Sequence, residues 1–131
     1  LFVTLAYNSK KFTDNIIYNK LLSDKLDTNL GYIYENVVAQ MLRASGKDLY
    51  YHTIIKRDGK GYYEIDFLQA DGSKISPIEV KSSGYKSHAS LDQFSDKYSS
   101  RTGHKYLVYT KDLKKDGNVL CLPIYMVPLL P

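Results

Sequence analysis

Residues 30–45 carry the clearest hydrophobic periodicity in the chain. Apolar side chains recur there every three or four residues, which is the spacing of one face of an α-helix. Asn29 is suited to cap the start of this predicted helix, and Gly46 suits the left-handed position just past its end. Glu35 lies at the margin of the apolar face, so we expect its carboxylate to reach the edge of a sheet packed against the helix. The apolar positions are Leu30, Ile33, Tyr34, Val37, Val38, Met41 and Leu42.

Three strands are predicted after this helix, over residues 49–56, 61–69 and 75–82. These segments are rich in β-branched and aromatic residues, and the turn-forming sequences 57–61 and 71–74 separate them. Short turns between neighbouring strands predict antiparallel pairing. We therefore expect a three-strand meander.

Residues 87–100 are predicted to form a second helix, followed by a strand over 105–110 and another over 119–122. The proline-containing tail, 123–131, is not expected to be regular. Because a helix connects the third strand to the fourth, these two strands are expected to run parallel. The order predicts an α/β fold in which helices flank a mixed central sheet.

The first 29 residues give weaker signals. Residues 1–6 fit a strand or the end of a helix, and residues 13–22 fit a short helix followed by a loop. The chain begins within an apolar run and without an initiator Met, so we expect a fragment of a longer chain. Its 131 residues fit one domain. The expected divisions of this domain are an N-terminal extension (1–28), a core (29–122) and a tail (123–131).

Composition places few limits on function. The net charge of +4 permits nucleic-acid binding without arguing strongly for it. Cys121 is the only cysteine, which excludes an internal disulfide and cysteine-rich zinc motifs and agrees with a cytoplasmic protein. No apolar run approaches the roughly 18 residues of a membrane span, so we expect no membrane partner.

The second predicted strand carries two acidic residues in alternation with apolar ones. Alternate residues of a strand share a face. Glu64 and Asp66 are therefore expected to point one way, and Ile65 and Phe67 the other.

The following turn decides whether these acids meet Glu79 and Lys81, which share a face of the third strand. A loop at residues 72–73 would place Asp66 opposite Glu79, and a loop at 71–72 would shift this pairing by two residues. Either loop puts three carboxylates and one amine on a single face, with opposed Cβ atoms about 4.5 to 5.5 Å apart. A three-residue turn would separate the two charged faces.

Three carboxylates converging with one lysine suit metal-dependent cleavage of phosphodiesters. Carboxylate oxygens are the ligands that Mg²⁺ and Mn²⁺ prefer. Such a metal polarises the phosphate and lowers the pKa of a bound water. A neighbouring lysine can orient that water or offset charge on the phosphate.

This arrangement resembles the PD-(D/E)XK superfamily of restriction-endonuclease-like nucleases. In that superfamily an Asp on one strand and a Glu-x-Lys on the next bind metal and drive hydrolysis, and a Glu from the first helix often joins them. The superfamily's proline before the Asp is replaced here by Ile65. The matching residues are Asp66, Glu79, Lys81 and Glu35, with Glu64 as a further possible metal ligand.

Four more residues are candidates for contact with DNA. Lys56, Arg57 and Lys60 lie in the turn before the acidic strand, where they either bind the phosphate backbone or form an ordinary solvated basic turn. Gln93 resembles a glutamine found in some members of the superfamily, although the tyrosine that follows, Tyr98, comes one residue later than in the usual pattern.

A second resemblance covers nearly the whole chain. It implies an N-terminal ATPase domain in the same chain. The fragment itself is expected to hold no ATP site, because Gly59 and Gly61 are not followed by the Gly-Lys-Ser/Thr of a phosphate-binding loop. The segments similar to an uncharacterised C-terminal domain of bacterial and archaeal AAA-type ATPases are, in order, residues 30–42, 49–52, 64–67 and 77–83.

Several functions remain open at this point. The favoured one is Mg²⁺- or Mn²⁺-dependent hydrolysis of DNA. Alternatives are a nuclease-like module that binds DNA or a protein partner without catalysis, and a structural platform for assembly of the ATPase. The simplest alternative is a solvated hairpin face on which Glu64 and Lys81 form a weak cross-strand ion pair.

Overall fold

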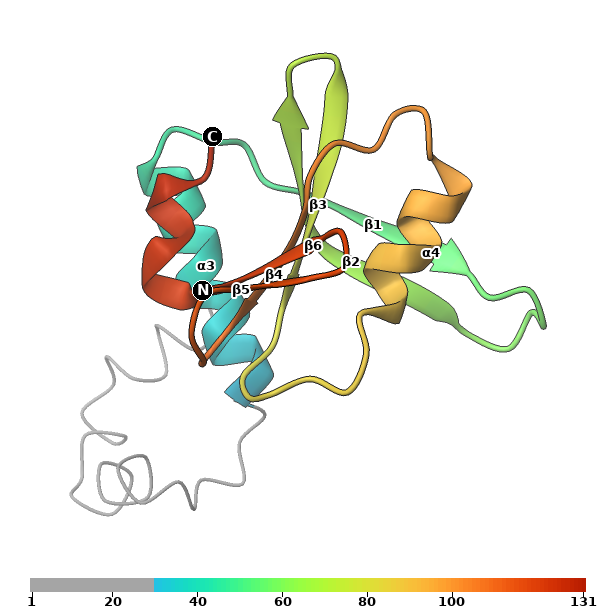
Figure 1. The fold of residues 1–131 in the computed structure, drawn as a ribbon, viewed down its shortest axis with the longest axis horizontal. Coiled ribbons are helices and arrows are strands. Elements are labelled where there is room, and N and C mark those ends of the chain that lie inside the picture. Colours follow the sequence, from blue (N-terminus) through green and yellow to red (C-terminus); the bar gives the residue numbers. More distant parts are fainter. Residues whose placement is uncertain (1–29) are drawn as a thin grey trace, which may run out of the picture.

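The structure, a computed structural model, describes residues 30–131, so the expectations for residues 1–29 lie outside it. The helices and strands expected in the described part are present, with some changed ends (Figure 1). The elements in chain order are α3 (Leu30–Ala44), β1 (Tyr50–Ile55), β2 (Tyr62–Asp71), β3 (Lys74–Val80), α4 (Ala89–Lys97), β4 (Lys105–Tyr109), β5 (Lys114–Asp116), β6 (Val119–Pro123) and the 3₁₀ helix η1 (Ile124–Leu129).

The strands form one six-stranded mixed sheet in the order β1-β2-β3-β4-β6-β5. β1, β2 and β3 form the expected antiparallel meander. β3 and β4 run parallel, as the helical connection predicted, and β6 is parallel to β4. The expected mixed α/β architecture is therefore confirmed.

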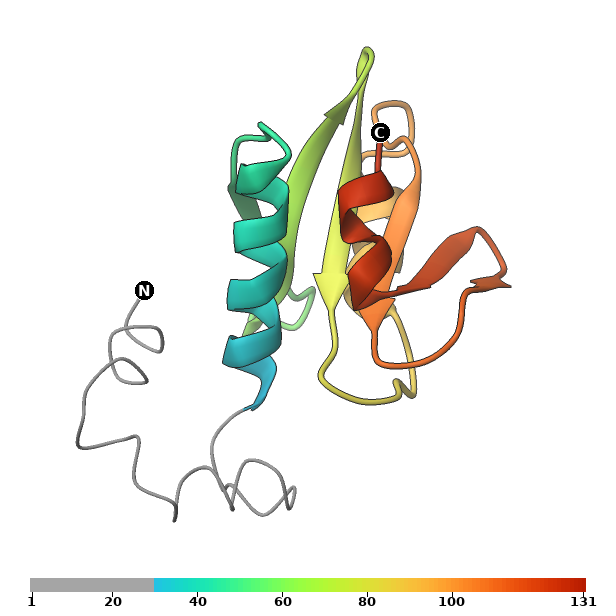
Figure 2. The ribbon, with the colours of Figure 1, turned by 90° about the vertical axis from the view of Figure 1, so that its left-hand side faces the viewer.

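Helices cover both faces of the sheet. Figure 2 shows α3 and η1 side by side on one face, with α4 on the other. Val38 of α3 and Val127 of η1 are buried in the core on their face, and Leu91 and Phe94 of α4 are buried in the other. Each face of the sheet thus has its own hydrophobic core.

Gly46 ends α3 in the way its position predicted. It has a positive φ of 78°, and its N–H donates to the carbonyl of Arg43. The N–H of Lys47 donates to the carbonyl of Leu42, which completes a Schellman motif. This motif ends the helix at Ala44.

The C-terminal part differs from expectation. The tail is not irregular, because residues 124–129 form η1, which buries Val127, and Leu130 directly after it is buried in the same core. Pro123 precedes the 3₁₀ helix with a φ of −65°, so its ring does not obstruct the helix, and Pro128 lies inside it. Strand β5 was not predicted; it is short and polar, and it pairs with β6 around Gly117.

Candidate functional site

The turn between β2 and β3 has the two-residue form that brings the charged segments together. Asp71 pairs with Lys74, so residues 72–73 form the loop. From there backbone pairing extends to Phe67 opposite Ile78 and ends. The next residues of the two strands lie beyond the ladder, and the site begins at this divergence.

A β-bulge in β2 lies beside this divergence. Tyr50 of β1 lies opposite Leu68, whereas His52, two residues further along β1, lies opposite Ile65. The extra residue on β2 breaks the alternation of faces. Ile65 is buried in the core under α4, and Phe67 packs against the core under α3. The expectation that Ile65 and Phe67 share one face was therefore wrong.

Asp66 lies within this bulge, and a hydrogen bond to its side chain takes the place of a backbone bond between β2 and β3. Its Oδ2 accepts a hydrogen bond of 2.7 Å from the backbone N–H of Val80. A side chain thus fastens β2 to β3 at the point where their backbones stop pairing. This contact brings the Asp66 carboxyl to the end of β3.

Glu79 and Lys81 lie beside the Asp66 carboxyl at the end of β3. Glu79 is buried, with 5 % of its surface exposed, and its Oε1 lies 2.6 Å from the Lys81 ammonium. The second oxygen of Glu79, Oε2, is buried without a hydrogen-bond partner in the described structure. Lys81 pairs with Glu79, so the cross-strand ion pair with Glu64 considered from the sequence does not form.

A cavity of about 470 Å³ opens between these strands, α3 and α4. Glu35 lines it from the first turns of α3, because α3 begins beside the end of β3 (Figure 2). Tyr62, Tyr63 and Ser90 complete the wall and were not identified from the sequence; the position of the two tyrosines directly before Glu64 was the available signal. The charged residues that line the cavity are Glu35, Glu64, Asp66, Glu79 and Lys81.

The carboxyl groups in this cavity disfavour one another's ionisation. Burial raises the pKa of Asp66 to about 7; the N–H of Val80 and the Lys81 ammonium oppose this shift, while the charges of Glu35 and Glu79 add to it. Burial also raises the pKa of Glu35, helped by the charge of Glu64 and opposed by Lys81. The cavity therefore favours a proton or another cation at its acidic groups.

The residue types that line the cavity suit a divalent cation, although the present positions of their side chains do not form a complete ligand set. Within residues 30–131, no three His, Cys, Asp or Glu side chains are grouped closely enough to hold a metal ion. The donors are nevertheless carboxylate oxygens, which suit Mg²⁺ and Mn²⁺, and Glu79 Oε2 is a buried acceptor with no partner. Rotation of the exposed Glu64 side chain is the simplest way to complete a ligand set.

A second cavity of about 460 Å³ lies on the other side of Tyr63. It brings together three of the four predicted DNA contacts, and the Lys56 ammonium lies 5.2 Å from the centre of the Tyr63 ring. Lys60 does not line it; the backbone N–H of Lys60 instead donates to the Asp58 carboxylate. The lining residues are Lys56, Arg57, Asp58, Tyr63, Gln93 and Asp96, so two acids offset the two basic side chains.

Comparison with known proteins identifies the family. Residues 30–127, from α3 into η1, match the family described as Domain of unknown function (DUF4143). The chain belongs to the DUF4143 family. DUF4143 domains typically lie at the C-terminus of AAA-type ATPases. No curated protein and no solved structure matches the chain.

The matched segment of this DUF4143 member contains every candidate site residue named above. None of the helices within residues 30–131 combines the length and the apolar character needed to cross a bilayer.

Proposed function

We propose that this DUF4143 domain is a metal-dependent nuclease of the PD-(D/E)XK type that hydrolyses phosphodiester bonds of DNA. The observation that carries the proposal is the cavity shared by four carboxyl groups and Lys81 at the ends of two diverging strands. The order of helix, antiparallel meander, helix and parallel strand supports the resemblance to that superfamily.

Each charged residue has a role in this proposal. Asp66 and Glu79 would hold Mg²⁺ or Mn²⁺, with Glu64 and Glu35 assisting. A divalent ion bound there supplies a Lewis acid for the phosphate and lowers the pKa of a bound water. Lys81 is 39 % exposed and already faces the cavity beside Glu79, so its ammonium can donate to the attacking water or to a phosphate oxygen.

The setting of the domain is part of the same proposal. We infer that it works in the cytoplasm with an N-terminal ATPase domain of the same chain, since the family typically has this arrangement. Lys56, Arg57 and Gln93 would contact DNA beside the cavity, because Tyr63 forms a wall of both hollows. The ATP site would lie in that N-terminal ATPase domain.

Cleavage assays with purified protein and Mn²⁺ test the nuclease proposal. We expect wild-type protein to cut DNA, and Lys81→Ala and Glu79→Gln each to slow cleavage by about 100-fold or more, since both lose a group that acts on the metal, the water or the phosphate. Calorimetry should detect Mn²⁺ binding to Lys81→Ala but not to Glu79→Gln.

Lys74→Ala is the matched control, because Lys74 lies at the other end of β3 from the cavity. It should cut DNA at the wild-type rate. If wild-type protein leaves linear, supercoiled and single-stranded DNA intact, and calorimetry detects no Mn²⁺, the enzymatic proposal is wrong.

A second candidate is a nuclease-like module that binds DNA without cutting it. The observation that favours it is the absence, among residues 30–131, of a ready-made group of metal-ligating side chains. In that case the double variant Asp66→Ala/Lys81→Ala would bind a fluorescent oligonucleotide as tightly as wild-type protein. If this double variant loses DNA binding, and binding by wild-type protein depends on Mn²⁺, the second candidate is wrong.

A further inference from the structure

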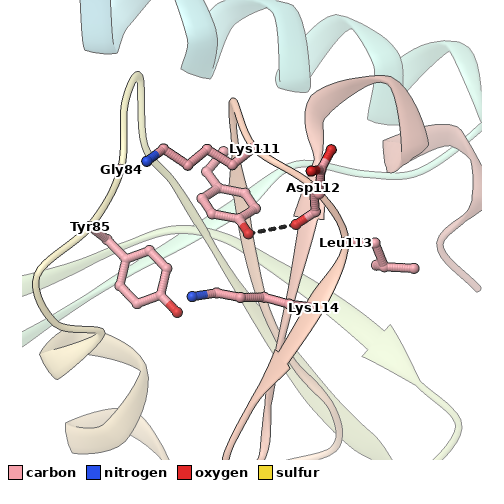
Figure 3. Close-up of a pocket in the computed structure, with 7 residues that line it drawn as sticks. Gly84, Tyr85, Lys111, Asp112, Leu113 and Lys114 are labelled. Atoms are coloured by element: carbon pink, nitrogen blue, oxygen red, sulfur yellow. Dashed lines mark hydrogen bonds between the residues drawn. The ribbon is translucent and has the colours of Figure 1, made fainter.

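Another pocket lies beyond the end of β3, after Lys81 in the chain (Figure 3). It has a volume of about 300 Å³ and is enclosed by the loop after β3, the end of β4 and the turn into β5. Gly84 and Tyr85 form one wall. Tyr109, Lys111 and Lys114 form the other. None of these residues takes part in the acidic cavity.

Two hydrogen bonds fasten the walls of this pocket. The Tyr85 hydroxyl donates to Oδ2 of Asp116 over 2.5 Å, which ties the loop after β3 to β5. The Tyr109 hydroxyl donates to the backbone carbonyl of Asp112 over 2.6 Å, which holds the turn after β4 (Figure 3). Both phenols are thus engaged within the protein, and the pocket is formed before any ligand arrives.

The free charges that face this pocket are ammonium groups. Lys114 Nζ lies 4.9 Å from the centre of the Tyr85 ring, and Lys111 Nζ lies 3.5 Å from the position that a Cβ at Gly84 would occupy. Neither lysine forms an ion pair with a carboxylate of residues 30–131. The Asp112 side chain also lines the pocket, but Figure 3 shows its carboxylate on the far side from both ammonium groups. The Asp116 carboxylate lies nearby: the hydrogen bond from Tyr85 and the charges of His88 and Lys114 lower its pKa. Two ammonium groups that face one hollow without a direct carboxylate partner suit an anionic ligand.

The pocket lies close to the acidic cavity along one edge of the sheet. The N–H of Lys81 donates to the carbonyl of Val108 over 2.8 Å, and Tyr109 follows directly into the pocket wall. Gly84 is three residues after Lys81, a span of at most about 10 Å. A nucleic-acid strand advances about 3.4 Å per nucleotide, so an anion in the pocket would lie within roughly three nucleotides of a phosphate at Lys81.

We propose that this pocket binds a backbone phosphate of the same DNA strand that places another phosphate at Lys81, within roughly three nucleotides along the strand. Lys111 and Lys114 supply the charge, and the small Gly84 leaves room for the Lys111 ammonium. The identity of the polyanion as DNA rests on the proposed function. Because β3 and β4 are parallel and end at the same edge, the strand would cross the carboxyl ends of β3 and then β4.

The salt dependence of DNA binding tests this proposal. Binding of a fluorescent DNA oligonucleotide is measured by anisotropy in a chelator over a series of NaCl concentrations. Each lost phosphate contact lowers the slope of log K against log [salt] by about 0.7 to 0.9. The double variant Lys111→Gln/Lys114→Gln loses the one phosphate contact of the pocket, so it should have a slope smaller by about 0.7 to 0.9 than that of wild-type protein, and an affinity about 5- to 8-fold lower near 0.1 M salt.

The control is Lys74→Gln/Lys115→Gln, which removes the same net charge. Lys115 is adjacent to Lys114 on β5, so it points to the opposite face of that strand. Lys74 lies at the turn between β2 and β3, away from the pocket. The slope of this control should match that of wild-type protein.

The outcomes separate this inference from the nuclease proposal. An equal slope for wild-type protein and the Lys111/Lys114 variant, with cleavage intact, overturns the phosphate pocket alone. A reduced slope in the absence of any Mn²⁺-dependent cleavage supports the pocket and contradicts the nuclease. Equal losses in both double variants indicate a general charge effect and overturn the pocket, and a failure of wild-type protein to bind DNA overturns both proposals.

Discussion

Asp66→Asn is expected to stabilise the metal-free protein at pH 8, although it removes a proposed metal ligand. Burial raises the pKa of Asp66 to about 7 from an ordinary value of 3.8. That difference corresponds to about 4 kcal/mol of folding free energy. Asparagine is neutral and keeps an oxygen that can accept the N–H of Val80. We expect a gain of roughly 2 to 4 kcal/mol in the free energy of unfolding.

The direction of the pH dependence follows from the raised pKa. Between about pH 4 and pH 7 the folded protein holds a proton on Asp66 that the unfolded chain has released, so stability falls as the pH rises through this range. The advantage of Asp66→Asn over wild-type protein should therefore be small near pH 4, grow up to about pH 7 and remain constant above it. Urea denaturation in EDTA at several pH values measures this difference in the free energy of unfolding.

Asp71→Asn, on the same strand, is expected to change the stability at pH 8 in the opposite direction. Hydrogen bonds from His104 and Ser76 lower the pKa of Asp71, so its carboxylate contributes stability above its ordinary pKa that is lost at lower pH. Asp71→Asn should therefore destabilise the protein at pH 8. Added Mn²⁺ should stabilise wild-type protein and Asp71→Asn but not Asp66→Asn. Lower stability of Asp66→Asn at both pH 5 and pH 8 would contradict the prediction.

Asp92→Ala is expected to destabilise the protein by about 3 kcal/mol. Lys105 at the start of β4 is only 4 % exposed, and its ammonium donates to Oδ1 of Asp92 on α4 over 3.0 Å. No other carboxylate within residues 30–131 forms an ion pair with it. Removing Asp92 leaves a buried charge without a partner, which costs more than the pair contributes. The value lies at the low end of the usual range because the Asp92 side chain is 42 % exposed.

Lys105→Met distinguishes the effect of the buried charge on stability from that of the packing of the side chain. Methionine fills a similar volume without a charge, so we expect a change of less than about 1.5 kcal/mol. The double variant Asp92→Ala/Lys105→Met should be more stable than Asp92→Ala alone. Thermal denaturation of the three variants measures this difference, and a double variant less stable than Asp92→Ala would show that Lys105 does not depend on Asp92.

The local patterns predicted most of the secondary structure. The periodicity of α3 and the glycine at its end predicted Leu30–Ala44 to within one residue, because helical spacing and capping depend on neighbours in the sequence. β5 has no such signal, since three polar residues form a strand only because β6 lies beside them. In the tail, proline content suggested irregularity, but burial of Val127 in η1 and of Leu130 after it outweighed it.

The candidate site divides in the same way. Residue types predicted that Asp66, Glu79 and Lys81 would meet if the turn were even-numbered, and the resemblance to the nuclease superfamily added Glu35; all four line one cavity. In the structure these residues come together although a bulge interrupts the regular alternation of faces along β2. The bulge depends on how β2 pairs with β1, and the pattern of residues within β2 does not reveal it.

The sequence by itself determined most of the elements and the charged groups available to the site, because each follows from residues close together along the chain. The structure decided between the hairpin registers that the sequence left open, with residues 72–73 as the loop. Only the tertiary structure decided that β2 and β3 separate beyond Phe67 and Ile78, that the Asp66 carboxyl replaces a ladder bond, and that Lys111 and Lys114 face a pocket beside Lys81. These features depend on which distant segments pack together, and packing sets the burial that shifts the pKa of Asp66.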